Sequence, residues 1–408
     1  MYQAFKNFYI ALKILASSLW TACKNNFSFR HVLCVQGILK LAFLYSMTVI
    51  YIILFYFEFP SGGPKKEGPP AIAIYGCIGR IGESLLKERV VIAAKKLGWR
   101  VIDVNFPEGL TTYPLTKSFF TSAASIVNLI YKPKFNLAVT HYVYVVPYGY
   151  NITYLNMPRE SLFNINMRFQ RSFKHLEEYD AYIDLYTLAN GSNNILDAAL
   201  KGIGRSQAPI IPLYLAENGA DYIAPEKRDK ALLIGSLWGC NRASHRMGHA
   251  LKKLAENGDL IAYGIKEYIG FLGYGYKGSI EDYGANRDLN NSQALASLHK
   301  EAGVALIIHS LEHMVDGIPT NRIAEAINAG AIAISDDNSF VRKYFGDNVL
   351  YIDSVKPSDQ IYSQIQTHLE WIRAHPQEAE IKARAAHDIL NREFSMESSL
   401  KKLMDIRK

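Results

Sequence analysis

The sequence predicts an α/β protein with two Rossmann-like domains that face a cleft, preceded by an N-terminal transmembrane helix. Three observations lead to this prediction. A strand, a glycine-bearing turn and a helix begin at Ala71, a second such unit begins near Ala231, and an uncharged apolar run, Leu41–Phe57, precedes both. Alternating strands and helices are typical of parallel sheets that are covered by helices on both faces.

The first unit opens with the apolar strand Ala71–Tyr75. Three glycines follow it: Gly76, Gly79 and Gly82. A helix to about Leu97 and a strand at Val101–Val104 complete a βαβ pattern. The glycine spacing is not the G-x-G-x-x-G of dinucleotide-binding turns. We therefore interpret these glycines as needed for a tight turn and close helix packing.

The second unit reads A-L-L-I-G-S-L-W-G-C-N-R from Ala231, a strand that ends in a Gly-Ser turn at Ser236, with Arg242 close behind. Ala243–Asn257 is the predicted helix that follows. Arg242 is a candidate anion-binding residue, because a fixed cation stabilises charge on a phosphate group. A surface arginine at a helix start is an equally good interpretation.

Gly303–Ile308 is a predicted buried strand, and His309 follows at its carboxyl end. Ligands gather at this end of the strands in a parallel sheet, so His309 is a candidate site residue. His141, Asp180 and Asp184 are weaker candidates, because a catalytic base needs reach to its proton and a suitable pKa, and the sequence shows neither. We therefore assign no catalytic base.

Residues Asp316–Asp337 read D-G-I-P-T-N-R-I-A-E-A-I-N-A-G-A-I-A-I-S-D-D, a capped helix that leads directly into a buried strand. Pro319 and Thr320 suit the helix start, and Gly330 suits its end. The apolar stripe of the helix comprises Ile323, Ala326 and Ile327. Ala331–Ser335 is the predicted strand.

The polar residues of this helix suit recognition of phosphate and hydroxyl groups. Asn321 and Glu325 stand four residues apart and so share a face. Arg322 lies in the first turn, where free N–H groups and the helix dipole favour an anion. On spacing alone, a solvated helix is the simpler interpretation.

The run H-S-L-E-H-x-x-D-G-I-P-T-N-R-I-A-E-A-I-N-A-G-A-I-A-I-S-D resembles the donor-site block of group-1 glycosyltransferases with the GT-B fold, nearest to the spore-maturation-protein-like (CgeB-like) branch. The resemblance implies that Glu325 holds the donor ribose hydroxyls. It also implies that the helix start, with Thr320, Asn321 and Arg322, faces the nucleotide diphosphate.

The resemblance is strong over residues 300–353 and loose over the rest of 71–404. It implies that Ser236 and Arg242, in the loop that opens the donor domain, also meet the diphosphate. Many relatives carry a second acidic residue eight positions before the ribose-binding glutamate, where this chain has Gly317. Asp316 is one residue further away, so this loop does not identify the sugar.

The implied activity is that of a membrane-anchored glycosyltransferase, which transfers a sugar from a nucleotide sugar to an unidentified glycan, lipid or protein acceptor. No D-x-D motif is present, so we expect no metal and no other cofactor. Family analogy favours retention of the anomeric configuration. A non-catalytic sugar-nucleotide-binding or membrane scaffold protein of the same fold is the alternative, and a sugar-nucleotide epimerase is a second enzymatic one.

The N-terminal region contains the predicted membrane anchor. Leu41–Phe57 is about 25 Å long as a helix, and extension back to Leu33 gives the length that a membrane core of about 30 Å requires. The segment P-S-G-G-P-K-K-E-G-P-P follows as a linker, which argues against a core helix. Phe5–Cys23 is either an interfacial amphipathic helix or a second pass.

The expected organisation has six parts. They are a membrane-associated segment (1–32), a single-pass anchor (33–59), a linker (60–70), an acceptor domain (71–225), a donor domain (226–370) and C-terminal helices that pack back on the first domain (371–408). The positive-inside rule places the N-terminus in the cytoplasm and the domains outside. Nucleotide-sugar supply instead favours a cytoplasmic catalytic domain in a bacterium, whereas in a eukaryote the same charge pattern suits an anchor with a lumenal domain.

Composition limits the possible partners. The formal charge of the 408 residues is +7, but residues 1–70 hold seven Lys or Arg against two Glu. The basic excess therefore belongs mainly to the N-terminal region, and we expect no nucleic acid partner. The four cysteines have neither C-x-x-C nor metal-ligand spacing, which argues against a disulfide framework or a zinc site.

Overall fold

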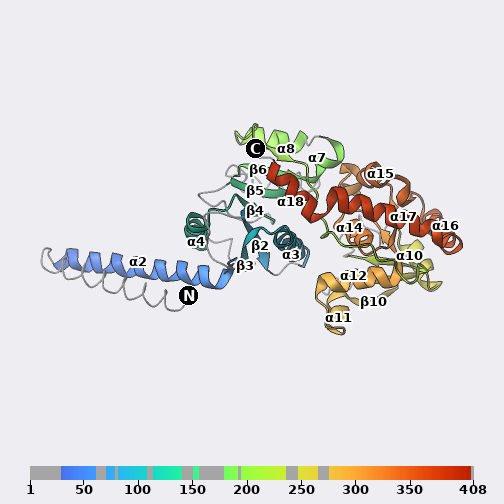
Figure 1. Cartoon of the computed structure of the whole chain (residues 1–408), viewed down its shortest axis with the longest axis horizontal. Coiled ribbons are helices and arrows are strands. Elements are labelled where there is room, and N and C mark those ends of the chain that lie inside the picture. The colour runs from blue at the N-terminus through green and yellow to red at the C-terminus, as the bar shows by residue number, and fades with distance from the viewer. Residues whose placement is uncertain are drawn as a thin grey trace.

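The protein has two parallel sheets that are each covered by helices, with one long helix projecting from the first (Figure 1). This architecture comes from a computed structural model, which describes residues 29–60, 70–78, 81–107, 114–139, 150–155, 179–191, 194–235, 247–264 and 275–405. The predicted α/β class with two parallel sheets is confirmed.

The first sheet has the order β1-β3-β2-β4-β5-β6-β7. Its strands are β1 (Phe57–Glu58), β2 (Ala71–Ile78), β3 (Arg100–Pro107), β4 (Phe135–Ala138), β5 (Tyr150–Leu155), β6 (Ala181–Asp184) and β7 (Ile210–Ile211). The short strand β1 pairs antiparallel with β3, and the other neighbours pair in parallel. Strand β2 is apolar on both sides because it is buried on both faces of the sheet.

Successive residues of β2 point to opposite faces and so join different cores. Ile72 and Ile74 pack toward α3 (Ile81–Lys96), whereas Ala73 and Tyr75 pack toward α4 (Pro114–Tyr131) and α2 (Phe29–Tyr56). The short helices α7 (Leu185–Asn190) and α8 (Asn194–Gly202) follow β6. Asp184 caps α7, since its Oδ2 accepts from Thr187 N at 2.8 Å, so this candidate has a structural role.

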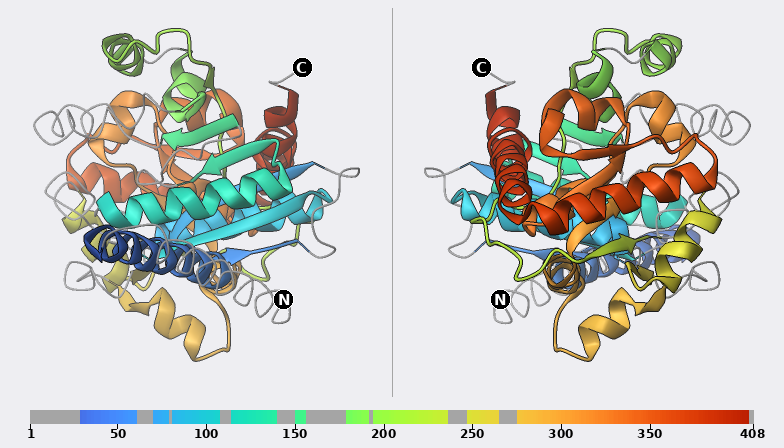
Figure 2. Two further views of the ribbon diagram at one scale, coloured as in Figure 1. Left: turned by 90° about the vertical axis from the view of Figure 1, so that its left-hand side faces the viewer. Right: turned by 90° about the vertical axis from the view of Figure 1, so that its right-hand side faces the viewer.

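Helix α2 (Phe29–Tyr56) covers most of the segment that we predicted to be a membrane anchor. Its C-terminal half lies beside α4 (Figure 2, left view), where Val49 and Ile52 are buried and Tyr45 Oη is 2.6 Å from Ser122 Oγ. No helix within the described residues meets the length and apolarity of a membrane span. The predicted transmembrane helix is therefore not supported, since at least one face of the run packs on protein. Phe5–Cys23 lies outside the described residues.

The second sheet has the order β10-β9-β8-β11-β12-β13, and all of its pairs are parallel. Its strands are β8 (Lys230–Ile234), β9 (Leu260–Gly264), β10 (Tyr276–Ser279), β11 (Gly303–Ile307), β12 (Ile332–Asp336) and β13 (Leu350–Ile352). The chain leaves β8 toward β9 and later returns to the other side of β8 as β11. In open α/β sheets, ligands bind at the carboxyl ends of the strands where the order reverses, which here are β8 and β11.

Helices cover both faces of the second sheet. Those that connect its strands are α10 (Gly248–Glu256), α11 (Ile280–Ala285), α12 (Asn291–Ala302), α13 (Leu311–Asp316), α14 (Asn321–Asn328), α15 (Ser339–Phe345) and the 3-10 turn η3 (Gly346–Asn348). Helix α12 starts with a complete capping box, in which Asn290 and Gln293 bond reciprocally. Helix α14 and strand β12 agree with the helix and strand that we predicted for this part of the chain.

The C-terminal helices connect the two domains. They are α16 (Ser358–Ala374), α17 (Pro376–Ile389), the π-turn η4 (Leu390–Phe394) and α18 (Met396–Asp405). Helix α17 packs on the second domain, and α18 lies against α3 of the first (Figures 1 and 2). Ser399 Oγ donates to Tyr214 O at 2.8 Å, and Glu397 pairs with Lys96 at 3.2 Å. The apolar core continues through this return and holds the domains together.

Candidate functional site

The site starts at the carboxyl end of β8, where Gly235 has φ +153. A Cβ atom there would lie 2.7 Å from Cζ and Nη2 of Arg322, so glycine is what lets the guanidinium occupy this position. Arg322, in the first turn of α14, therefore lies against the end of β8. The next residue, Ser236, and Arg242 lie outside the described residues.

The start of α14 has two buried polar atoms that lack partners. Thr320 is the N-cap residue and has extended backbone angles, but its side chain makes no capping hydrogen bond. Thr320 Oγ1 and Asn321 Oδ1 are buried without a hydrogen-bond partner in the described part of the chain. Native proteins satisfy most buried polar atoms, so this helix start is suited to a polar ligand.

His309 follows β11 and is completely buried. Its backbone N–H donates to Asp336 Oδ2 at 2.8 Å, and its ring Nδ1 is hydrogen-bonded to Asp336 Oδ1. Asp336 is the last residue of the neighbouring strand β12 and is also completely buried. The carboxylate therefore fixes the orientation of the imidazole. The nearby His313 has a local role, because its Nδ1 is 3.1 Å from Ser310 Oγ.

The acidic residue that many relatives carry at the position of Gly317 does not fit this backbone. Gly317 has φ +64, and a Cβ atom there would overlap Ser339 Oγ. Asp316, one residue earlier, ends α13 and is 1 % exposed, and its carbonyl accepts from Asn190 Nδ2. Glycine at this position is thus a requirement of the αL turn.

Glu325 lies one turn after Arg322 on α14 and contacts the first domain. Arg89 Nη2, from α3, donates to Glu325 Oε1 at 3.0 Å and also pairs with Glu217 Oε1 in the segment between the domains. The side chains of Arg89, Glu217 and Glu325 are 4 %, 14 % and 11 % exposed. One buried guanidinium therefore holds two carboxylates.

Burial and charge shift the pKa values around this group. Burial alone would lower the pKa of Arg89, but the two carboxylates outweigh it and raise this pKa. Burial raises the pKa of Glu217 to about 7, against the opposing effect of Arg89, and Glu325 adds to the rise. Burial also lowers the pKa of His299, on α12, to about 4. His299 is therefore neutral near pH 7.

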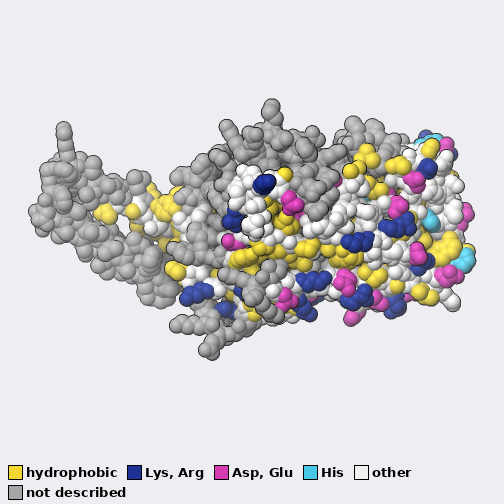
Figure 3. Space-filling view, turned by 90° about the horizontal axis from the view of Figure 1, so that it is seen from above, with side chains coloured by type: hydrophobic (Ala, Val, Ile, Leu, Met, Phe, Trp, Pro, Cys, Tyr) yellow, Lys and Arg dark blue, Asp and Glu magenta, His cyan; other side chains and the backbone are white. Residues whose placement is uncertain are grey.

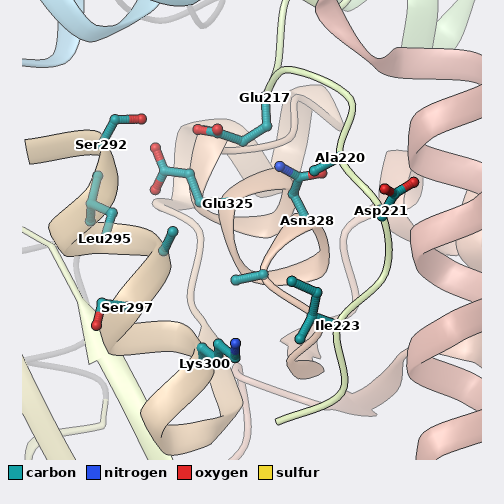
Figure 4. Close-up of a pocket in the computed structure, with 12 residues that line it drawn as sticks. Glu217, Ala220, Asp221, Ile223, Ser292, Leu295, Ser297, Lys300, Glu325 and Asn328 are labelled. Atoms are coloured by element: carbon teal, nitrogen blue, oxygen red, sulfur yellow. The ribbon is translucent and has the colours of Figure 1, made fainter.

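A pocket of about 340 Å³ opens beside Glu325 (Figure 4). It lies between α12, α14 and the interdomain segment, and the carboxylates of Glu217 and Glu325 turn toward one another at its edge. The other lining residues are Ala220, Asp221, Ile223, Ser292, Leu295, Ala296, Ser297, Lys300, Asn328 and Ala329. Carboxylate, amide, hydroxyl and ammonium groups beside aliphatic side chains suit a ligand that has hydroxyls and an apolar ring face.

The structure brings the predicted residues together only in part. Glu325 lines the pocket, Arg322 reaches the end of β8, and His309 ends β11. Sequence reasoning missed Arg89, Glu217 and Asp336, because their partners are distant in the chain. Across the described ranges, no cluster of three or more His, Cys, Asp or Glu side chains has the arrangement of a metal site.

Two parallel sheets, a reversal of strand order in the second and a C-terminal helix that returns to the first domain define a two-domain α/β fold of the GT-B type. In sequence, residues 246–405 match a family described as glycosyl transferase-like. This match runs from just before α10 to the end of α18. A search of curated protein sequences found no significant match.

Solved structures share the fold at low sequence identity. An alpha-glucosyltransferase in complex with UDP-glucose and DNA has a TM-score of 0.58 and 11% identity, over 83% of this chain and 99% of its own. Anabaena HepE in complex with UDP-glucose has a TM-score of 0.53 and 11% identity, with the same coverage. Sucrose-phosphate synthase from Thermosynechococcus elongatus has a TM-score of 0.51 and 12% identity, over 83% of this chain and 98% of its own. These likenesses establish the fold.

Proposed function

We propose that this protein is a glycosyltransferase that takes its sugar from a nucleotide-sugar donor. The observation that carries the proposal is Glu325, which lines the pocket and whose Oε2 accepts no hydrogen bond from any described residue. A carboxylate oxygen in this setting suits a ribose hydroxyl. The glycosyl transferase-like match and the fold shared with two proteins bound to UDP-glucose support sugar transfer.

The diphosphate would lie at the start of α14. Arg322 supplies a guanidinium beside the end of β8, and Thr320 Oγ1 and Asn321 Oδ1 supply unpaired polar atoms nearby. We propose that Arg322, Arg242 and the helix N-terminus stabilise the charge that develops on the departing nucleoside diphosphate, in place of a metal. Ser236 would add a hydroxyl at the same loop.

In the reaction, the bond between the anomeric carbon and the diphosphate oxygen breaks and a bond to the acceptor oxygen forms. The acceptor proton passes to a base that we do not assign. We propose that His309, held by Asp336, borders the transferred sugar. We also propose that Asp316 contributes to the donor site indirectly, through the turn at Gly317 that ends α13. Retention of configuration and membership of the spore-maturation-protein-like branch are further parts of this proposal, supported by the resemblance alone.

The acceptor is proposed to be a glycan, a lipid or a protein. On the face that Figure 3 shows, Lys and Arg side chains are interspersed with Asp and Glu over the second domain, which does not favour a polyanion. One structural relative is bound to DNA as well as UDP-glucose, so DNA belongs in an acceptor screen as a contrary outcome.

We also propose that the N-terminal region attaches the enzyme to a membrane. Leu44 and Tyr51 on α2 are 60% and 51% exposed, and Leu129 on α4 is 61% exposed, so apolar side chains face outward from this helix pair. The catalytic domains would be cytoplasmic in a bacterium and lumenal in a eukaryote. Sedimentation of the full chain with liposomes, compared with a chain that begins at residue 71, tests this attachment.

The activity is tested with the purified full chain and a panel of nucleotide sugars. Release of nucleoside diphosphate is measured with and without glycan, lipid, protein and DNA acceptors. We expect release from one nucleotide sugar, accelerated by one acceptor class. Binding of a nucleotide sugar without release in any combination would instead identify a non-catalytic sugar-nucleotide-binding protein.

A further inference from the structure

Arg89 is a buried cation that the first domain contributes to the pocket of the second. It lies in the middle of α3, and its side chain is 4 % exposed. Its Nη2 contacts Glu325 Oε1 at 3.0 Å and Glu217 Oε1, and its carbonyl accepts from Asn218 Nδ2 at 3.1 Å. Arg89 is thus fixed from both ends by groups that surround the pocket.

A buried guanidinium keeps its charge, because arginine does not deprotonate in proteins. Its presence favours the ionised form of each carboxylate that it contacts. Without it, Glu217 and Glu325 would face one another as like charges in a site with little solvent, and one of them would take up a proton. Arg89 therefore offsets the repulsion between these two carboxyl groups.

The contact uses only one oxygen of Glu325. Arg89 donates to Oε1, whereas no described residue donates to Oε2, and the residue lines the pocket of about 340 Å³. A carboxylate with one oxygen bound to a fixed cation has its plane and side-chain rotamer set. The other oxygen is then oriented to accept a hydroxyl.

We propose that Arg89 is a positioning residue of the donor site: it holds Glu325 by Oε1 so that Oε2 accepts a ribose hydroxyl of the nucleotide. This inference rests on the proposed function and extends it, since it makes the first domain, otherwise the acceptor side, a part of donor recognition. Oε2 of Glu325 is then held in position to accept the hydroxyl only while α3 and α14 are in contact.

The test uses the full chain and the nucleoside diphosphate that it binds best among UDP, GDP, ADP and CDP. In Arg89→Met, Glu325 loses the donor that fixes Oε1, so Oε2 is no longer held toward the pocket. We expect the affinity to fall about ten- to hundred-fold, the range of a lost hydrogen bond to a charged group. Arg89→Lys should bind within about fivefold of the wild type.

Two further variants separate positioning from packing. In Arg89→Met/Glu217→Gln the neighbouring carboxylate is gone, so like-charge repulsion no longer displaces Glu325. The donor to Oε1 is still missing, so binding should stay weaker than in the wild type. Lys96→Met is the matched control, because Lys96 lies on the same helix and also bridges the domains, through Glu397 at 3.2 Å and Gly219 O at 3.2 Å, but does not line the pocket. We expect its affinity to stay within about twofold of the wild type.

The outcomes are distinct. If the wild type binds none of the nucleotides, the proposed function fails and this inference fails with it. If Glu325→Ala weakens binding but Arg89→Met binds like the wild type, the proposed function stands and the role of Arg89 is refuted. An equal loss in Arg89→Met and Lys96→Met would also refute it, because domain packing would then explain both variants.

Discussion

Gly235→Ala tests the placement of Arg322 against the end of β8. The new Cβ atom would lie 2.7 Å from Cζ and Nη2 of Arg322, whereas an ordinary carbon contact needs about 3.5–4.0 Å. The guanidinium must therefore move by roughly 1 Å. It is the far end of a flexible side chain, so the movement costs little stability. The cost appears instead in the geometry of any phosphate contact.

Gly278→Ala is the matched control for backbone strain. Gly278, on β10 of the same sheet, also has φ +153, but a Cβ atom there would meet only Tyr263 Cε1 at 4.0 Å. Both substitutions carry the same backbone penalty, on the order of 1–3 kcal/mol. We therefore expect similar losses of unfolding free energy for the two variants in chemical denaturation.

Binding of the nucleoside diphosphate separates the two variants. A misplacement of about 1 Å can cost about 10²-fold, so we expect Gly235→Ala to bind about ten- to hundred-fold more weakly and Gly278→Ala within about threefold of the wild type. Gly235→Ala/Arg322→Ala should bind no worse than Arg322→Ala, because both changes remove one interaction. Equal calorimetric affinities for Gly235→Ala and Gly278→Ala would refute the placement of Arg322 at the diphosphate.

Two further predictions concern stability. The pKa of Glu217 is raised in the folded protein, so the folded state binds its proton more tightly and stability from this group is lost as pH rises from about 4.5 to about 7. Glu217→Gln should remove about 2–3 kcal/mol of this pH-dependent loss of unfolding free energy, measured by chemical denaturation at several pH values. If the unfolding free energies of the variant and the wild type change with pH in the same way, the burial of this carboxyl is contradicted. Gly317→Asp, which restores the acidic residue of relatives, should destabilise by about 2–4 kcal/mol, because φ is +64 and Ser339 Oγ fills the space. Gly258→Ala, with φ +75 and open space, should cost only about 1 kcal/mol, and an equal cost for both would contradict the steric argument.

Local patterns predicted the elements that carry the site. The apolar stripe and glycine stop of α14 and the apolar run of β12 are short-range signals, and the structure has α14 at Asn321–Asn328 and β12 at Ile332–Asp336. The same holds for β2, α3 and β3. The apolar run before them left two interpretations open, because Val49 and Ile52 are buried against α4 and apolar length alone does not distinguish protein from lipid.

Contacts between distant segments were not predictable. Arg89 and Glu325 are 236 positions apart in the chain, and their contact exists only because the domains pack together. Arg89 lies in the run K-E-R-V-V-I-A-A-K-K, where its spacing is that of any solvated helix face. The sequence shows that Gly317 replaces the acidic residue. Only the structure explains the glycine, which lies in a left-handed turn beside Ser339.

A paired affinity measurement shows whether Glu325 binds the donor ribose. The full-length wild type and Glu325→Ala are each titrated with the preferred nucleoside diphosphate and with its 2′-deoxy form. Glu256→Gln, an exposed carboxylate on α10, serves as the control. We predict that the wild type binds the ribonucleotide about ten- to hundred-fold more tightly than the deoxynucleotide, and that Glu325→Ala loses this preference. A preference that Glu325→Ala retains in full would contradict the account.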